Sequence, residues 1–274
     1  LAFSDGKWDV LSFSLIMVGS ILVQIGTNLV DEYADDARAE REEKLIAPYK
    51  VIALGLLSHQ SVKAGAICCF GLATCIGIYL TFKVGWPILA IGLVSLLVAY
   101  CYSAGPIPLG SLALGEIVVF IFMGPIMVGG TYYVYTESFS IETFAMSIPI
   151  ACMVTAILVA NDLRDVEEDR NAGKRTIVTI MGKKFGRTLW MALIMTGYSV
   201  VFFQSVFSTH VDNIYHSTLF LLPLLAFPLA MKAFRMVYSR EDRYGLSIGM
   251  QQTAGLHLWF GLLLSFSVVG TTEL

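Results

Sequence analysis

Residues 143–161 read TFAMSIPIACMVTAILVAN, and the chain continues at residues 161–176 with NDLRDVEEDRNAGKRT. The first stretch is almost entirely apolar and matches the roughly 20 residues that a helix needs to cross a bilayer. The second stretch is dense in Asp, Glu, Arg and Lys. This junction favours a transmembrane helix that leaves the membrane into a charged site at one membrane surface.

The rest of the chain repeats this pattern of long apolar segments. Of its 274 residues, 56% are hydrophobic and 14% are charged, and the mean hydropathy is +0.72. Such a composition indicates that lipid surrounds most of the surface. Each segment also contains Gly, Ala, Ser or Thr, as closely packed transmembrane helices do. The eight candidate spans cover residues 9–30, 64–82, 86–103, 113–135, 143–161, 187–207, 215–236 and 251–270. The sequence therefore predicts a single all-α domain over residues 1–274, a polytopic transmembrane helical bundle in a lipid bilayer.

Basic residues are distributed unevenly over the two sides of this bundle. When eight spans are threaded alternately through the membrane, every Lys and Arg lies in or beside the connections on one side, except Lys7 and Lys83. Because Lys and Arg are retained in cytoplasmic connections, we expect that side to be cytoplasmic, in the plasma membrane of a bacterium or archaeon. The net charge of −3 gives no indication of a nucleic-acid partner.

Two acidic stretches, residues 28–43 and 161–176, leave the membrane on that same side. Each contains two aspartates four residues apart, which project from one face if the helix continues: Asp31 and Asp35, and Asp165 and Asp169. Like charges at this spacing repel each other, so a compensating cation is expected between them. Mg²⁺ commonly binds one or two carboxylates together with substrate phosphates, so the two pairs predict a Mg²⁺-bridged diphosphate site. The second stretch also offers basic side chains for direct phosphate contacts: Arg164, Arg170, Lys174 and Arg175.

Each of these residues also has a plainer interpretation. A single aspartate at a membrane exit is often only a solvated loop residue. Two pairs on one side, each led by an asparagine at the membrane edge, Asn28 or Asn161, favour a functional site, because polar groups at membrane depth are costly. For Asn28, a polar contact between packed transmembrane helices is an alternative explanation.

Three further side chains are candidates for substrate contacts. Lys44 and Lys50, in KLIAPYK, are placed to contact phosphate or an acceptor carboxylate, although loop lysines are more often merely solvated. Tyr102 is a candidate for the acceptor cavity, although aromatic residues at span ends usually mark the membrane interface.

Four stretches of the chain resemble the UbiA superfamily of intramembrane prenyltransferases. Residues 161–176 look like its second aspartate motif, and NLVDEYADD at residues 28–36 resembles the first, usually written NDxxDxxxD. Residues 102–133, which begin YSAGPIPLGSLALGE, and QQTAGLHLWFGLLL at residues 251–264 are similar to the branch that prenylates 1,4-dihydroxy-2-naphthoate in menaquinone synthesis. The likeness covers about residues 20–270, and the second motif with its AGKRT tail is the most specific element.

The resemblance implies a fold, a mechanism and a set of site residues. The family has nine spans, so we expect the first to precede Leu1. Mg²⁺ would neutralise the diphosphate of a polyprenyl donor, and an aromatic acceptor would attack the allylic cation that forms as pyrophosphate departs. The implied metal ligands and catalytic residues are Asp31, Asp35, Asp165 and Asp169. The implied substrate contacts are Asn28, Glu32, Lys44, Lys50, Tyr102, Asn161, Arg164, Lys174 and Arg175. Other acceptors in the superfamily, 4-hydroxybenzoate, homogentisate or a chlorophyllide, stay open.

The chain departs from the family pattern in the first motif. Asp31-Glu32 stands where the family usually has Asn-Asp, and Ala39 stands where a Gly commonly follows. Glu32 carries its carboxylate one methylene further from the backbone than Asp would. Because Mg²⁺ tolerates poor geometry badly, this departure bears on metal placement and substrate choice.

A cation-coupled transporter is the alternative from another functional class. Transporter ion sites usually lie near the bilayer midplane, on broken helices of repeated halves. Here the carboxylates gather at helix ends on one side, and the two halves of the sequence show no repeat. The pattern favours a prenyltransferase.

Overall fold

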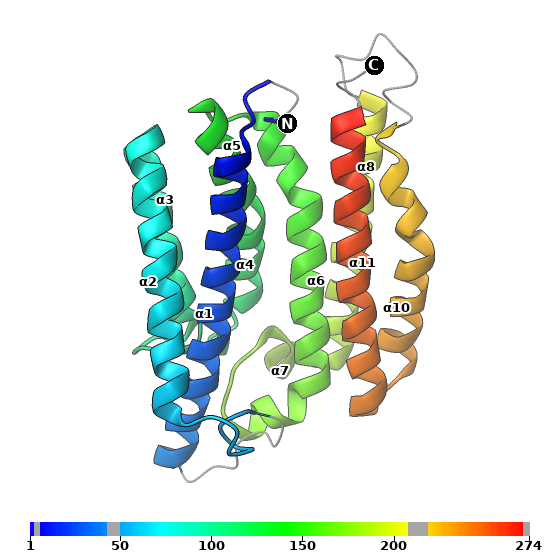
Figure 1. Cartoon of the computed structure of the whole chain (residues 1–274). Coiled ribbons are helices and arrows are strands. Elements are labelled where there is room, and N and C mark those ends of the chain that lie inside the picture. Colours follow the sequence, from blue (N-terminus) through cyan, green and yellow to red (C-terminus); the bar gives the residue numbers. More distant parts are fainter. Residues whose placement is uncertain (3–5, 43–49, 208–218, 271–274) are drawn as a thin grey trace.

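The computed structural model describes residues 1–2, 6–42, 50–207 and 219–270. Within these ranges the chain is helical, and extended backbone pairs only at an isolated bridge between Leu112 and Arg175. The predicted all-α bundle is confirmed. Its long helices run side by side, and α1 begins at the same end of the bundle at which α11 ends (Figure 1).

The α-helices are α1 (Val10–Glu42), α2 (His59–Val84), α3 (Trp86–Ser103), α4 (Gly115–Ile121), α5 (Met127–Thr136), α6 (Ile141–Asn171), α7 (Ile177–Met181), α8 (Lys183–Phe207), α10 (Phe227–Ser239) and α11 (Arg243–Gly270). Short helical turns of other types add η1 (Leu109–Ser111), η2 (Phe122–Ile126) and η3 (Leu222–Ala226). Polar caps fix several starts: Ser140 Oγ, for example, accepts hydrogen bonds from the backbone N–H groups of Glu142 and Thr143 at the start of α6.

Seven of the eight predicted spans correspond to helices that are long and apolar enough to cross a membrane. The remaining one, residues 215–236, differs: its first residues lie outside the described ranges, and the rest forms η3 and the first part of the shorter α10. Two helices run past their predicted ends into the aspartate stretches: α1 continues to Glu42 and α6 to Asn171. Both aspartate stretches are therefore helical, at least through their paired aspartates.

The predicted span 113–135 is interrupted by one turn of π-helix, η2. Pro125 lies in this turn and has no N–H to donate, and its ring would crowd the carbonyl of the preceding turn in a regular helix. The wider turn accommodates the ring. Gly124 in the same turn packs directly on α6, since a Cβ there would lie 2.3 Å from the Cβ of Ala151.

The bundle has a packed half and a hollow half. In the packed half, α6, α8, α10 and α11 enclose a continuous apolar core around Trp190, Phe260 and Leu163. In the hollow half, α1 to α5 bury only two small apolar clusters and surround a large cavity with α6. Figure 1 shows α6 between the two groups of helices.

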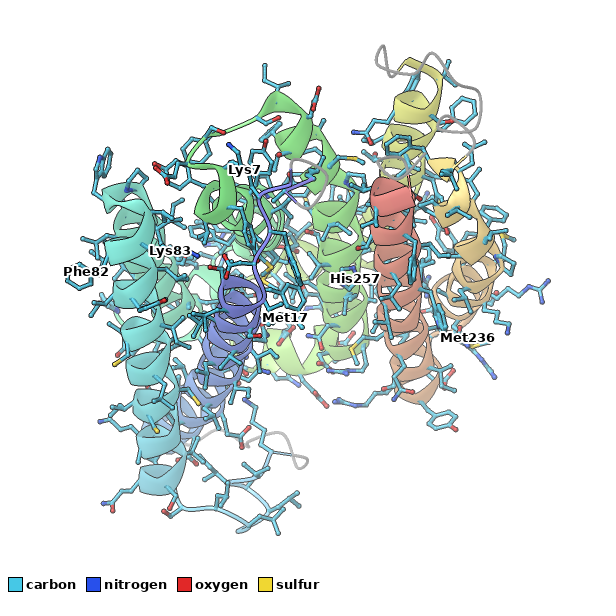
Figure 2. All side chains as sticks on the ribbon, turned by 45° about the horizontal axis from the view of Figure 1, so that its top comes forward. Lys7, Met17, Phe82, Lys83, Met236 and His257 are labelled. Carbon is cyan, nitrogen blue, oxygen red and sulfur yellow. The ribbon has the colours of Figure 1, made fainter. Side chains whose placement is uncertain are left out.

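The outer surface is apolar, as a lipid-facing surface must be. Phe82 and Ile141 are each 87% exposed and Trp86 is 75% exposed, and Figure 2 shows Phe82 pointing away from the bundle. Lys7 and Lys83 lie at the end where α1 begins (Figure 2), whereas the aspartate stretches lie at the opposite end.

Candidate active site

A cavity of about 1470 Å³ occupies the hollow half and reaches the helix ends that carry both aspartate stretches. At this end its walls include all four paired aspartates: Asp31, Asp35, Asp165 and Asp169. Away from them the walls are mostly apolar, with Leu15, Leu80 and Val134 near the far end. The structure therefore brings together two motifs that are more than a hundred residues apart in the sequence, at the mouth of one cavity.

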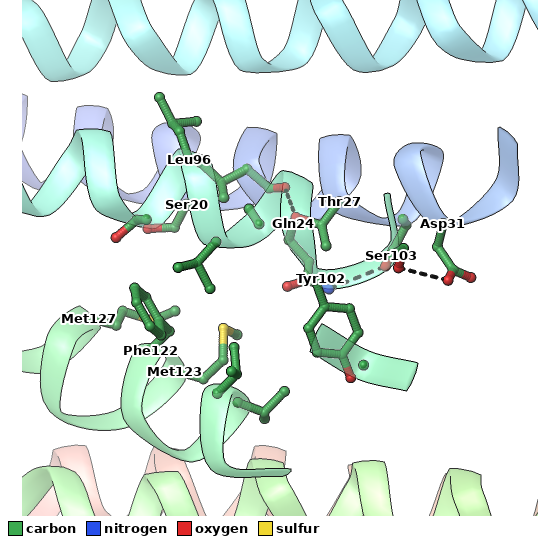
Figure 3. Close-up of a pocket in the computed structure, with 18 of the residues that line it drawn as sticks. Ser20, Gln24, Thr27, Asp31, Leu96, Tyr102, Ser103, Phe122, Met123 and Met127 are labelled. Carbon is green, nitrogen blue, oxygen red and sulfur yellow. Dashed lines mark hydrogen bonds between the residues drawn. The ribbon is translucent and has the colours of Figure 1, made fainter. Parts of the chain in front are cut away.

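The first pair is bridged by a lysine. Because α1 stays helical, the Asp31 and Asp35 carboxylates point the same way, and Lys50 Nζ lies 3.2 Å from the former and 2.8 Å from the latter. Burial alone would lower the pKa of the Lys50 ammonium, but the two carboxylates together outweigh burial and the pKa is raised. Ser103 Oγ also donates to Asp31, over 2.8 Å (Figure 3). The cation expected between like charges is thus supplied by the chain itself.

Lys174 joins the two motifs. Its Nζ lies 2.9 Å from Asp35 Oδ2, although Lys174 follows the second motif in the sequence. Gly173, at a φ of +70°, ends α6 in a left-handed conformation and lets the chain turn back, so that Lys174 N–H donates to the Asp169 carbonyl over 2.8 Å. The pKa of Lys174 is raised: burial opposes this, but the charges of Asp31 and Asp35 outweigh it. Two ammonium groups therefore stand where an anionic diphosphate would meet the acidic pairs.

The two aspartates of the second pair have different surroundings. Asp165 is buried and forms ion pairs with its neighbour Arg164 and, at 3.1 Å, with Arg243 from the start of α11. Arg243 also pairs with Glu168. The Asp169 carboxylate lines the cavity and has no hydrogen bond or ion pair within the described ranges. Asp169 is thus the carboxylate of this pair that is open to a ligand.

The donor set fits Mg²⁺ that arrives with a phosphate ligand. All the candidate donors are hard carboxylate oxygens at one end of the cavity. Within the described part of the chain no three acidic, His or Cys side chains are grouped closely enough to hold a metal by themselves. Mg²⁺ seldom uses such an all-protein cage, and it usually combines one or two carboxylates with substrate phosphates and water. The arrangement suits a metal shared between the aspartates and a bound diphosphate.

A third acidic pair, Glu116 and Asp162, was not predicted from the sequence. Glu116 lies at the start of α4 and is 4% exposed, and Asp162 on α6 is 5% exposed. Their carboxyl groups lie close to each other. Glu116 also accepts a hydrogen bond of 3.3 Å from Ile177 N–H and so fastens the chain after the second motif to α4. In the sequence, Glu116 is distinguished only by its position near the start of an apolar span. Many acidic residues share such a position, so it does not indicate a functional role.

Arg243 is the other site residue that the sequence did not single out. It precedes the last span in a connection rich in basic residues, without any distinctive spacing. Only the packing of α11 beside α6 brings it to Asp165.

The other predicted site residues lie in several settings. Glu32 lines the cavity, and its Oε1 accepts a hydrogen bond of 3.1 Å from Ile52 N–H, which ties α1 to the chain after residue 50. Asn28 also lines the cavity and accepts a hydrogen bond of 3.3 Å from Gln24 on the same face of α1.

Tyr102, near the end of α3, lines the cavity beside Ser103 (Figure 3). Asn161 accepts a hydrogen bond of 2.7 Å from Arg164. The Arg175 side chain is exposed and does not line the cavity, and Lys44 lies outside the described residues.

Comparison with known proteins gives consistent matches. The sequence model of the UbiA prenyltransferase family matches residues 1–251. The 1,4-dihydroxy-2-naphthoate octaprenyltransferase of Bacillus subtilis (strain 168) is 28% identical over 98% of this chain and 85% of its own length. Among solved structures, a digeranylgeranylglyceryl phosphate synthase has a TM-score of 0.61 at 14% identity, over 100% of this chain and 90% of that chain. A UbiA homolog from Archaeoglobus fulgidus bound to DMAPP and Mg²⁺ has a TM-score of 0.59 at 13% identity, over 96% and 92%.

Proposed function

Because the chain belongs to the UbiA prenyltransferase family, we propose that it transfers a polyprenyl group from its diphosphate to 1,4-dihydroxy-2-naphthoate, with Mg²⁺, in menaquinone biosynthesis. The observation that carries the proposal is the shared cavity: both aspartate motifs line one end of it, and the remainder is long and apolar. This matches a substrate with a charged head and a hydrocarbon tail. The named relative supports the acceptor.

The chain's own residues account for binding the diphosphate. Lys50 and Lys174 present ammonium groups at the cavity mouth, and Arg164 presents a guanidinium there. Such groups form strong charge-assisted hydrogen bonds with phosphate oxygens. Mg²⁺ held by Asp31, Asp35, Asp165 and Asp169 would supply further positive charge to the leaving pyrophosphate.

The cavity walls account for the rest of the reaction. As the carbon–oxygen bond of the donor breaks, the allylic carbon becomes electron-deficient, and water would capture it. The apolar walls beyond Tyr102, including Phe122 and Met123 (Figure 3), exclude water and leave the aromatic acceptor as the available nucleophile. The prenyl tail then lies deeper in the cavity.

The acceptor assignment is tested with purified protein, Mg²⁺ and octaprenyl diphosphate. Each of three acceptors is supplied in turn: 1,4-dihydroxy-2-naphthoate, 4-hydroxybenzoate and homogentisate. The attacked ring carbon must lose the group it carried, either a proton or the carboxylate as CO₂, so we expect mass spectrometry to find the acceptor with the prenyl group in place of one of these. Transfer to another acceptor alone would replace the acceptor assignment, and no transfer to any of them would contradict the proposed function.

We also propose that the site faces the cytoplasm, because the connections at that end carry nearly all the Lys and Arg. Single cysteines placed in a cysteine-free background at Glu40 and Ala172 should react with a membrane-impermeant reagent only from the cytoplasmic side. A cysteine at Ser138 should react only from the opposite side. If positions 40 and 172 were labelled from opposite sides, the shared site would be excluded, since no diphosphate spans a bilayer.

A further inference from the structure

A smaller recess of about 290 Å³ lies between α3, the η2–α5 segment and the start of α6. Three of its lining residues, Ile91, Ile126 and Gly130, also line the main cavity, so the two spaces adjoin at these residues. Phe139 and Phe144, on the other side of the recess, are largely exposed on the lipid-facing surface. The recess therefore lies between the main cavity and the membrane.

The main cavity is closed beyond this junction. Leu80, Val84, Ile88 and Val134 form a buried apolar cluster at its far end. Val134 lies about one helical turn beyond Gly130 on α5. A hydrocarbon chain that fills the main cavity therefore meets a packed wall ahead and an adjoining space at the side.

Gly130 lies at the boundary between the two spaces and adds no side chain to it. It is a buried glycine inside a helix, where glycine is a poor helix former. Close packing does not demand it, since a Cβ at this position would meet nothing nearer than Ile91 at 3.6 Å, an ordinary contact distance. A larger side chain at position 130 would take up room at this boundary.

Thr143 gives an independent sign that the recess receives something other than protein. It is 1% exposed and lines the recess, and its hydroxyl has no hydrogen-bond partner in the described ranges. Threonine often donates to the carbonyl four residues earlier, but α6 begins only at Ile141. Buried unpaired hydroxyls are uncommon. A carbon–carbon double bond offers such a hydroxyl a weak acceptor.

We propose that the distal isoprenoid units of a long donor pass Gly130 and lie in this recess, so that Gly130 determines which tail lengths the enzyme accepts. The inference rests on the proposed function. An occupant that is apolar, unsaturated and continuous with the chain in the main cavity fits these observations, and a polyprenyl tail has all three properties. A short tail ends before the junction and does not need the recess.

The test compares kcat/KM for geranyl diphosphate and octaprenyl diphosphate in Gly130→Leu, with 1,4-dihydroxy-2-naphthoate as acceptor. We expect the short donor to stay within about twofold of the wild type and the long donor to fall roughly tenfold or more, because the added side chain occupies the passage. Gly71→Leu is the matched control. Gly71 is also a helical glycine with open space at its Cβ position, but it lines neither cavity, so both donors should be unaffected.

A second variant keeps the test decisive if Gly130→Leu does not fold. Gly129 lines only the recess, and a Cβ there would meet nothing within 4 Å, so Gly129→Leu should fold and should impair only the long donor. Equal losses with both donors, or no loss with either, would overturn the inference while leaving the proposed function standing. A wild-type protein that transfers neither donor to any acceptor would instead overturn the proposed function, and the inference with it.

Discussion

The two halves of the bundle are built from similar apolar residues but use them differently. In the packed half, side chains such as Trp190 and Phe260 fill the space between α6, α8, α10 and α11. In the hollow half, comparable side chains on α1 to α5 turn outward to lipid or line the cavity. Because lipid is as apolar as a protein core, helices in a membrane gain little from burying hydrocarbon and are held mainly by packing. The packed half can therefore stabilise the bundle while the hollow half keeps a cavity for a ligand. Helix α6 contributes to both halves.

The largest expected effect lies at the open end of the hollow half. Asp169→Asn should lower turnover by orders of magnitude while the unfolding temperature stays near that of the wild type. It removes an open carboxylate without leaving another charge unpaired. Steady-state rates and thermal unfolding in detergent measure the two quantities.

Asp165→Ala is the informative companion to Asp169→Asn. It should lower both turnover and stability, since Arg164 and Arg243 lose their common partner. Near-normal turnover in either folded variant would remove the second motif from the mechanism.

The first motif gives effects that differ from residue to residue. Asp35→Asn should be severe, because Asp35 binds both Lys50 and Lys174. Glu32→Asp should be tolerated, with an altered preference among divalent metals. Glu32→Gln keeps an oxygen for the Ile52 N–H and removes only the charge, so a clear loss of turnover would assign Glu32 an electrostatic role. If both Glu32 variants behave like the wild type, the role of Glu32 is limited to its hydrogen bond with the Ile52 N–H.

A matched pair of truncations tests the contrast between the halves directly. Phe260→Ala leaves a cavity in the packed core and should lower the free energy of unfolding by about 3–5 kcal/mol, with little change in the kcat of the folded enzyme. Phe122→Ala removes a ring from the cavity wall and should instead change the KM for the donor, with little change in stability. If Phe122→Ala lowered stability and Phe260→Ala changed the KM for the donor, the contrast between the packed and hollow halves would be contradicted.

The smallest effect is expected at the end away from the motifs. Hydrogen bonds from Lys83 and from Ser12 lower the pKa of Asp9 to about 2. A lowered carboxyl pKa stabilises the fold above the unfolded value near 4, and this contribution is lost as the pH falls towards about 2. Asp9→Asn should therefore unfold at a slightly lower temperature than the wild type at pH 6, and the difference should vanish across that acidic range. A constant difference would mean that packing, not charge, explains the effect.

The sequence predicted the parts that depend on local patterns. Apolar length located the long helices, and four-residue spacing placed Asp31 with Asp35 and Asp165 with Asp169, because both properties follow from helix geometry. It missed the shorter α10 and the π-turn at Pro125, where tertiary packing decides how far a helix extends. Arg243 and the Glu116–Asp162 pair were also missed, since their partners lie on distant segments. That Lys50 and Lys174 both converge on Asp35 depended on the fold as well.

The central claim is that the two motifs act on one diphosphate, and a double-mutant cycle tests it most directly. Single-turnover rates are measured with radiolabelled octaprenyl diphosphate for Asp35→Asn, Asp169→Asn and the double variant. Groups that act as a unit are strongly non-additive, so the double variant should be little slower than the slower single variant. If the two losses simply multiply, the motifs act independently, and the shared active site is contradicted.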